Sequence, residues 1–136
     1  MKPEEVNAMT DEQSQIKASE LMGWTDIRNV RLMIGGKDLT MRPNWQGCTP
    51  DGLLDPVPIP DYPNDIAAAW ELVNKLHEQY EVAVFSDYTL AVPVTDEFWR
   101  CTVNIDQMII ATTTDKDSAP RAITRAFILA MEENHE

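Results

Sequence analysis

Basic residues are scarce in this chain. Its 136 residues include 11 lysines and arginines against 23 aspartates and glutamates, which gives a formal net charge of −12. Proteins that coat nucleic acids bind the phosphate backbone through lysine and arginine. The charge balance therefore argues against double-stranded nucleic acid as a partner.

Cysteine and histidine are rare as well. Cys48 and Cys101 stand 53 positions apart without a partner motif, so neither a disulfide framework nor a zinc site is indicated, and both thiols are predicted to be reduced. A Ser-His-Asp or Cys-His catalytic centre would have to use His77, because His135 lies next to the C-terminal end. His77 falls on the apolar stripe of a predicted helix, where a packed histidine is the simpler interpretation.

Glycine-rich loops and closely spaced metal ligands are missing too. The five glycines include one pair, Gly35-Gly36, and form neither a phosphate-binding loop nor a dinucleotide-binding motif. Asp115 and Asp117 follow a run of three threonines, but the closing glutamate of a calcium loop is absent. We expect no catalysis, no metal and no cofactor.

Long apolar runs are absent. No stretch approaches the roughly 18 apolar residues that cross a bilayer, and residues 1–5 lack the apolar core of a signal peptide. The sequence therefore predicts a soluble, cytoplasmic protein without a membrane partner. Its 43% hydrophobic and 25% charged residues suit one globular domain, predicted to span 11–136 after a flexible N-terminus at 1–10.

The first part of the chain predicts a helix and a hairpin. A capping box of Thr10 and Gln13 begins a helix over 11–23, and Gly23 ends it. Two runs, 28–34 and 37–41, flank the Gly35-Gly36 turn of a hairpin. The expected pairs are Ile34 with Lys37, Leu32 with Leu39 and Val30 with Met41 on the apolar face, and Met33 with Asp38, Arg31 with Thr40 and Asn29 with Arg42 on the polar face.

Residues 43–63 contain six prolines and predict an extended loop. A helix over 65–80 follows, with Asn64 as its expected N-cap. Its apolar stripe is predicted from helical spacing to be Ile66, Ala69, Trp70, Val73, Leu76, His77 and Tyr80. Trp70 is thus expected in the core.

The last part of the chain predicts a small sheet and a final helix. Strands are expected at 81–85, 98–105 and 108–114, with a turn at Asp106-Gln107 and an irregular strand at 88–94. A helix over 119–133 is expected to be capped by Asp117 or Ser118 and to hold Arg121 and Arg125 on its outer side. The predicted fold is α+β: an N-terminal helix and hairpin, then a helix, a three-stranded antiparallel sheet and a helix, in alpha-beta-alpha layers.

The order of elements over 65–133 resembles the double-stranded RNA-binding domain. That module grips RNA with a basic cluster at the start of its final helix. The corresponding stretch here, residues 115–121, has Lys116 between two aspartates, so RNA binding is not expected.

A second resemblance covers residues 14–132. Its motifs are Leu21-Met22-Gly23-Trp24, a hairpin followed by Trp45, the stretch from Pro60 to Trp70, Phe98-Trp99-Arg100-Cys101, and an alanine-rich helix after Ala111-Thr112-Thr113-Thr114. In this order they resemble the phage ABA sandwich domain, a family of small phage and prophage proteins. The resemblance implies a phage or prophage origin, hence the cytoplasm of an infected bacterium, and it carries over no catalytic residue.

Positive charge is concentrated in residues 27–42, which carry a net charge of +3. Arginine forks bind phosphate oxygens and an indole stacks on a base. The candidate ligand-binding residues are Arg28, Arg31, Lys37, Arg42, Trp24 and Trp45. The first hypothesis is thus a non-enzymatic binding protein that sequesters a small anionic nucleotide signal as a counter-defence.

Other interpretations stay open. The basic residues could be paired with acids elsewhere on the surface, which is common and means little. The net charge also suits an acidic interaction module, or inhibitor, that docks on a basic host or phage protein. A hydrolase with paired carboxylates is the weakest hypothesis, because spacing singles out no acid. An exposed sheet edge would also suit a homo-oligomer.

Overall fold

The computed structural model describes residues 2–31, 33–39, 44–52, 55–88 and 97–133. Their helices are α1 (Pro3–Asn7), α2 (Asp11–Leu21), α3 (Ile66–Leu76) and α4 (Ala119–Glu133). Their strands are β1 (Thr25–Asn29), β2 (Met33–Ile34), β3 (Lys37–Asp38), β4 (Trp45–Cys48), β5 (Val57–Pro58), β6 (Glu81–Tyr88), β7 (Glu97–Ile105) and β8 (Met108–Asp115). The predicted α+β class and the order of the main elements are confirmed.

The main sheet is antiparallel, in the order β6-β7-β8. Asp106 and Gln107 form the turn between β7 and β8, both with positive φ, as predicted for a tight hairpin. Cys101 and Val103 of β7 are buried on the face that packs against the helices. All three predicted strands are confirmed, while the prediction of an irregular strand at 88–94 falls, beyond Tyr88, outside the described residues.

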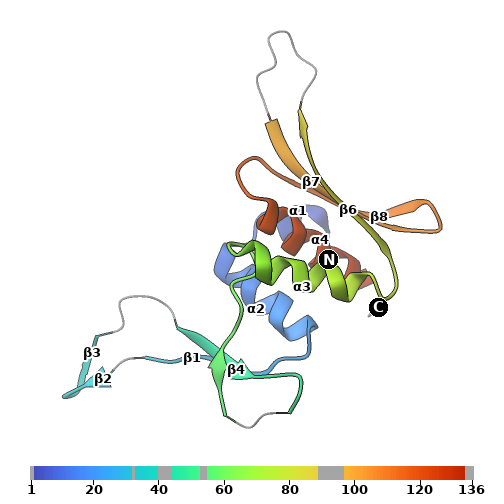
Figure 1. Cartoon of the computed structure of the whole chain (residues 1–136). Helices are drawn as coiled ribbons and strands as arrows, with labels where there is room; N and C mark the ends of the chain where they lie inside the picture. The colour runs from blue at the N-terminus through green and yellow to red at the C-terminus, as the bar shows by residue number, and fades with distance from the viewer. Residues whose placement is uncertain (1, 32, 40–43, 53–54, 89–96, 134–136) are drawn as a thin grey trace.

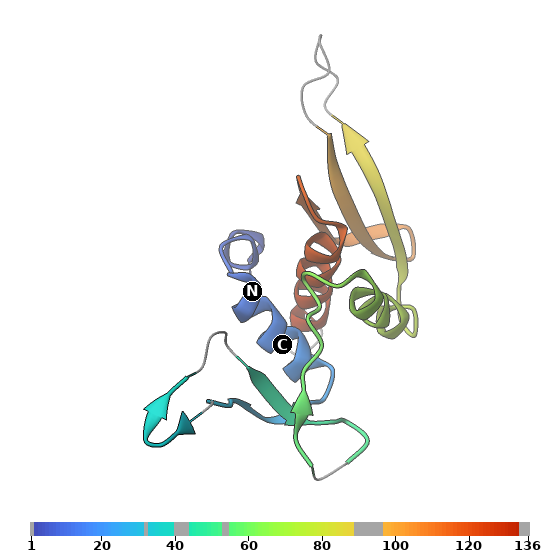
Figure 2. The ribbon, with the colours of Figure 1, turned by 60° about the vertical axis from the view of Figure 1, so that its left-hand side comes forward.

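Helix α4 occupies the centre of the molecule. It contacts β7 and β8 on one side and α1, α2 and α3 on the others, so the helices lie between the main sheet and the smaller one (Figures 1 and 2). Ile123, Phe127 and Ile128 are fully buried along it. The hydroxyl of buried Thr113 on β8 donates to the carbonyl oxygen of Ala122, which joins the sheet to α4.

Arg121 and Arg125 do not face the solvent, and the prediction that they do is wrong. The Arg121 Nε lies 2.8 Å from Asp11 Oδ1, and its Nη1 lies 3.3 Å from Asp115 Oδ1. Arg125 Nη1 lies 3.2 Å from Asp115 Oδ2. The arginines join α4 to α2 and to the end of β8, because α1 and α2 cover the side of α4 that the sequence pattern left open.

The buried face of α3 is rotated from the predicted one: Ala69, Val73, Leu76 and Tyr80 are buried as predicted, whereas Ile66, Trp70 and His77 are not. Its buried residues are Ala68, Ala69, Leu72, Val73 and Leu76. Trp70 and Ile66 remain 49% and 48% exposed, and His77 is an exposed C-cap residue. The prediction of a core Trp70 is wrong because small alanines, not the indole, allow close approach to α4. Asp65, not Asn64, caps the helix by accepting from the Ala67 N–H at 3.0 Å.

The N-terminal helices pack against α4. Thr10 and Gln13 form the predicted capping box of α2, and Gly23, with φ of +99°, follows the C-terminal end of the helix, as expected. Residues 3–7 form α1, and its Val6 is buried in the core. The N-terminus thus contains an element that the sequence analysis did not predict.

The proline-rich segment is not only a loop. Strands β1, β4 and β5 form a small antiparallel sheet, in which Asn29 pairs with Trp45 instead of Arg42. The pairs Ile34–Lys37 and Met33–Asp38 of the predicted hairpin are confirmed, while the predicted pairs Leu32–Leu39, Arg31–Thr40 and Val30–Met41 each include a residue outside the described part of the chain. Strand β1 takes β4 as its partner, and the Val30 N–H just beyond β1 donates to the carbonyl oxygen of Asn44 at 2.8 Å.

Strands β2 and β3, their Gly35-Gly36 turn and the flanking residues Arg31 and Leu39 form a segment that we call the arm. It extends away from the rest of the molecule (Figures 1 and 2). Both glycines have positive φ, 59° and 80°, which a two-residue turn requires and which other residues adopt at a cost. The arm is thus built as a hairpin but has no core of its own.

Candidate functional site

The predicted basic residues that the structure describes are exposed, and none of them lines the cleft described below. Arg28 lies on β1, while Arg31 and Lys37 belong to the arm. Arg31 Nη1 lies 3.5 Å from Asp38 Oδ2 with the arginine side chain 69% exposed, and such a pair contributes little. Arg42 lies outside the described residues. The three described cations are thus exposed, one on β1 and two on the arm.

The two predicted tryptophans support the small sheet. Trp45 Nε1 donates to Glu12 Oε1 at 2.7 Å, and Trp24 hydrogen-bonds the buried Tyr62. Both indoles are half-buried. Since each indole has one N–H donor, both donors are already engaged within the protein, and neither tryptophan lines the cleft described next.

A cleft of about 560 Å³ opens at the other side of the helix layer. It is lined by Asn64, Ile66, Trp70, Val84, Trp99, Asp117, Ser118, Ala119 and Pro120. Its volume is within the range of small-molecule and side-chain binding sites. Trp70 and Trp99 are 49% and 38% exposed, so two large aromatic surfaces face solvent at one place.

The sheet and the helices build the cleft together. Trp99 and Cys101 lie on the same face of β7 because side chains alternate along a strand, and Cys101 is buried under the helices. At Trp99, two residues nearer the start of the strand, the inner face of the sheet reaches the starts of α3 and α4. Trp70 lies one turn after Ile66 on α3 and supplies the opposite wall.

The backbone donors at the start of α4 are already used. The N–H groups of Asp117 and Ser118 donate to Asp115 Oδ1 at 3.0 and 2.8 Å. The Arg121 N–H donates to Ser118 Oγ at 3.2 Å, which confirms Ser118 as the cap, and Pro120 has no N–H. An anion in the cleft would therefore find few free donors, although helix N-termini are otherwise good anion sites.

Among the described residues that line the cleft, one is charged, and it is acidic. Asp117 is exposed at the cleft, and no lysine, arginine or histidine is among the lining residues. Asn64 is held by its side-chain amide, which donates to both carboxylate oxygens of Asp61 at 3.1 and 3.3 Å. Two indole faces and a carboxylate suit a cation with a flat or apolar stem better than a phosphate.

The buried Cys101 thiol and Tyr62 phenol are both held in their protonated, poorly reactive forms. Burial raises the pKa of the Cys101 thiol to about 12, which keeps it protonated and poorly nucleophilic. Burial, with Glu71 nearby, also raises the pKa of Tyr62 to about 12. Among the described residues, no group of three or more His, Cys, Asp or Glu side chains is placed to hold a metal ion. No helix in that part of the chain could cross a membrane.

The cleft was not predicted from the sequence, because the predicted apolar stripe of the helix over 65–80 placed Trp70 in the core. The signal was present: three consecutive alanines precede Trp70, and a shift of the stripe by one residue places Ala68, Leu72 and Leu76 inside. The alternation of β7 also put Trp99 on the same face as Cys101. What sequence could not supply was that this face reaches the ends of the helices.

No protein-family model, no curated protein and no solved structure matches the chain. The resemblance to the phage ABA sandwich domain therefore stays a prediction that depends on the sequence motifs alone.

Proposed function

We propose that this chain is a non-enzymatic interaction module that docks on a basic partner protein by taking an arginine or lysine side chain into the cleft. One observation carries the proposal: the cleft exposes Trp70 and Trp99, and Asp117 is the charged residue among its described lining residues. A guanidinium stacks on an indole and pairs with a carboxylate. Each such contact contributes about 1 kcal/mol at a partly exposed site.

The charge of the whole molecule supports the same partner. A net charge of −12 attracts basic surfaces and increases their association rate. Long-range attraction is screened by salt, whereas an arginine stacked between two indoles is held largely by short-range contacts. We therefore expect binding that weakens with salt but is not abolished by it.

A fluorescein-labelled tetra-arginine peptide is the first probe, measured by fluorescence anisotropy against the intact chain. We expect Trp70→Ala and Asp117→Asn each to weaken binding by about fivefold, the equivalent of about 1 kcal/mol. Circular dichroism should show both variants folded, since Trp70 and Asp117 are exposed.

Asp51→Asn is the matched control, because it removes the same charge from an exposed position that does not line the cleft. If Asp51→Asn weakens the peptide as much as Asp117→Asn does, binding is a nonspecific effect of net charge and the proposal is wrong. The same conclusion follows if a tetra-glutamate peptide binds equally well.

Sequestration of an anionic nucleotide is the second candidate, and the exposed cations Arg28, Arg31 and Lys37 favour it. Native mass spectrometry of the protein purified from a bacterial host tests it directly. A nucleotide released on denaturation, and lost when Arg31 and Lys37 are both changed to alanine, would favour sequestration by a phage counter-defence protein. A nucleotide that is kept in that variant would place the site elsewhere.

A further inference from the structure

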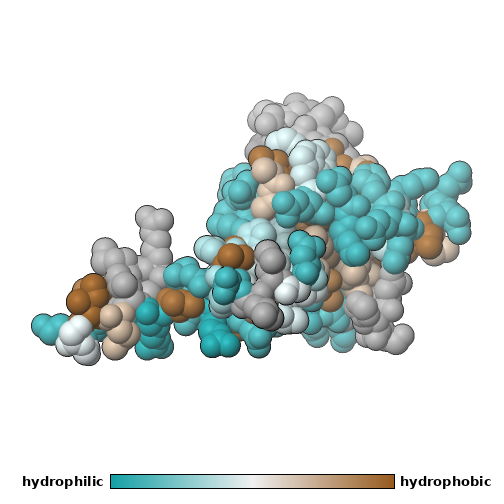
Figure 3. All heavy atoms as spheres, turned by 60° about the horizontal axis from the view of Figure 1, so that its bottom comes forward, coloured by the Kyte–Doolittle hydropathy of each residue, from teal (hydrophilic) through white to brown (hydrophobic). Residues whose placement is uncertain are grey.

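The arm exposes aliphatic side chains that nothing in its own hairpin covers. Met33, Ile34 and Leu39 are 55%, 57% and 46% exposed, and the two strands form two residue pairs. A two-stranded hairpin is marginally stable in water without a surface to pack on. Figure 3 shows the arm extending from the molecule with hydrophobic residues among hydrophilic ones. The arm thus has the features of a docking element.

Its charge is opposite to that of the molecule. Arg31, Lys37 and Asp38 give the arm a net charge of +1, and residues 27–42, which include it, carry +3, whereas the whole chain carries −12 and the other 120 residues together carry −15. Two copies repel each other in most orientations, because like net charges meet. The orientation in which the arm of one copy meets the acidic surface of another is the attractive one.

We infer that the arm of a second copy of this chain docks in the Trp70–Trp99 cleft, with Ile34 against the indoles and Lys37, its cross-strand partner on the same face, beside Asp117. The inference rests on the proposed function, since it uses the same cleft and names its partner. The arm has exposed apolar side chains that complement the two indoles of the cleft, and a neighbouring lysine that complements the Asp117 carboxylate.

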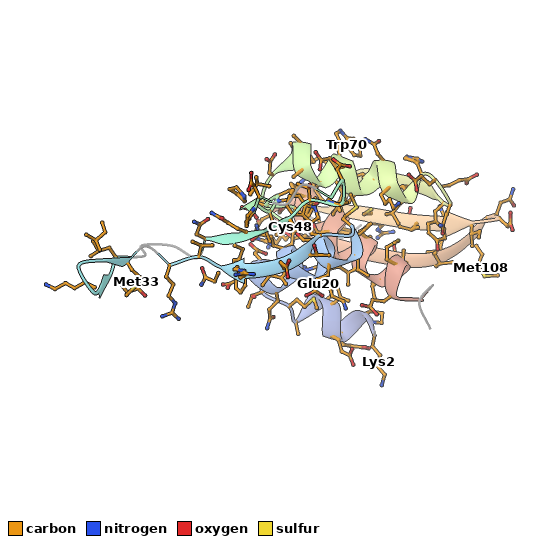
Figure 4. All side chains as sticks on the ribbon, turned by 90° about the horizontal axis from the view of Figure 1, so that it is seen from below. Lys2, Glu20, Met33, Cys48, Trp70 and Met108 are labelled. Atoms are coloured by element: carbon orange, nitrogen blue, oxygen red, sulfur yellow. The ribbon has the colours of Figure 1, made fainter. Side chains whose placement is uncertain are left out.

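A second copy is needed because the arm points away from its own cleft. In Figure 4, Met33 lies at the end of the arm, far from Trp70 on α3. Two copies related by a twofold axis would place each arm in the other's cleft, which closes the assembly as a dimer. An exchange of this kind buries both sets of exposed apolar side chains.

The test is sedimentation velocity of the full chain from 1 to 200 µM in 50 mM NaCl. We expect a monomer–dimer equilibrium whose dissociation constant rises at least tenfold for Ile34→Ser with Lys37→Glu, and as much for Trp70→Ala. Met108→Ser is the matched control: it removes an equally exposed apolar side chain at the β7–β8 turn and should leave the dimer intact. Restoration of the dimer by combining Lys37→Glu with Asp117→Lys would establish the contact.

Two outcomes would overturn the inference, and a third would support it while removing the proposed function. A monomer throughout this range, with tetra-arginine still bound at the cleft, removes the self-docking while the proposed function stands. A dimer that the arm variants weaken but Trp70→Ala does not would place the arm elsewhere. A dimer lost in both kinds of variant, from a protein that binds no tetra-arginine, supports self-docking and removes the general basic partner.

Discussion

At the scale of single residues, the ion pairs of Arg121 and Arg125 lie where α2, β8 and α4 meet. Asp115 is 9% exposed in its side chain and receives Arg121 and Arg125 from α4. It also accepts the N–H groups that shape the start of that helix. Breaking a nearly buried pair leaves a charge without its partner, which costs more than the pair itself contributes.

We expect Asp115→Asn to lower the free energy of unfolding by about 2 kcal/mol. The amide keeps an acceptor for the turn but loses the charge that faces the two arginines. Urea unfolding at pH 7 measures the change, with Asp51→Asn as the exposed control. Equal stability of the two variants would mean that the arginines find other partners.

The neighbouring pair makes stability depend on acid pH. The hydrogen bond from Arg121 holds the pKa of Asp11 below its ordinary value of 3.8, with burial opposing it. The carboxylate therefore contributes stability at pH values above the unfolded pKa, and this contribution is lost as pH falls through the lower folded pKa. In urea titrations from pH 6 to pH 2, Asp11→Asn should lose less stability than the parent chain does. Parallel curves for the two proteins would contradict this assignment.

Backbone strain at one residue can be relieved. Gln107 has a φ of +68° in the β7–β8 turn, a conformation that costs a side-chain-bearing residue about 1 kcal/mol. Gln107→Gly should therefore raise the melting temperature by about 4 °C. Thr114→Gly, at an exposed position within β8, should lower it instead. A fall in both variants would mean that Gln107 is not strained.

At the scale of elements, the sequence predicted the C-terminal half well and the region before α3 poorly. The helix over 119–133 and the three strands follow from strong local patterns that the core then uses unchanged. Strands β4 and β5 could not be predicted, because a short strand among prolines gains its stability from pairing with distant β1. The face of α3 was ambiguous because apolar residues lie on both sides of Ala69.

Helix α3 provides a direct check of which face is buried. Leu72 is fully buried whereas Trp70 is half-exposed. We expect Leu72→Ala to cost about 3 kcal/mol of unfolding free energy and Trp70→Ala less than about 1 kcal/mol. Chemical denaturation of the two variants measures this. A larger loss of unfolding free energy in Trp70→Ala than in Leu72→Ala would mean that Trp70 is buried, as the sequence predicted.

The candidate site could be predicted only in part. Sequence identified the arm and its cations, since the Gly35-Gly36 turn and the run of basic residues are local features. The cleft depends on how far β7 extends past the ends of two helices, which is a property of packing. The strand face on which Trp99 lies could therefore be predicted from the sequence, but its position in a cleft could not.

At the scale of the whole molecule, alkaline pH should destabilise the fold. The pKa of Cys101 is raised from 9.0 to about 12, and that of Tyr62 from 10.0 to about 12, in both cases chiefly by burial. The folded state keeps protons that the unfolded state releases, so stability is full below pH 9 and falls as pH rises toward 12. Urea unfolding from pH 8 to pH 11.5 should show this fall reduced in Tyr62→Phe. An unchanged fall in that variant would assign the effect to other groups.

The central position of α4 has a consequence for how the chain folds during synthesis. Every other described element precedes α4 in the sequence, and the residues of α1, α2 and the main sheet bury their apolar faces largely against it. Domains generally fold as units during synthesis. Here the earlier elements cannot bury their apolar faces against α4 until residues 119–133 have left the ribosome. Until α4 has been synthesised, the segments before it therefore form an open precursor, and chaperones that recognise exposed apolar strands have their longest opportunity in that interval.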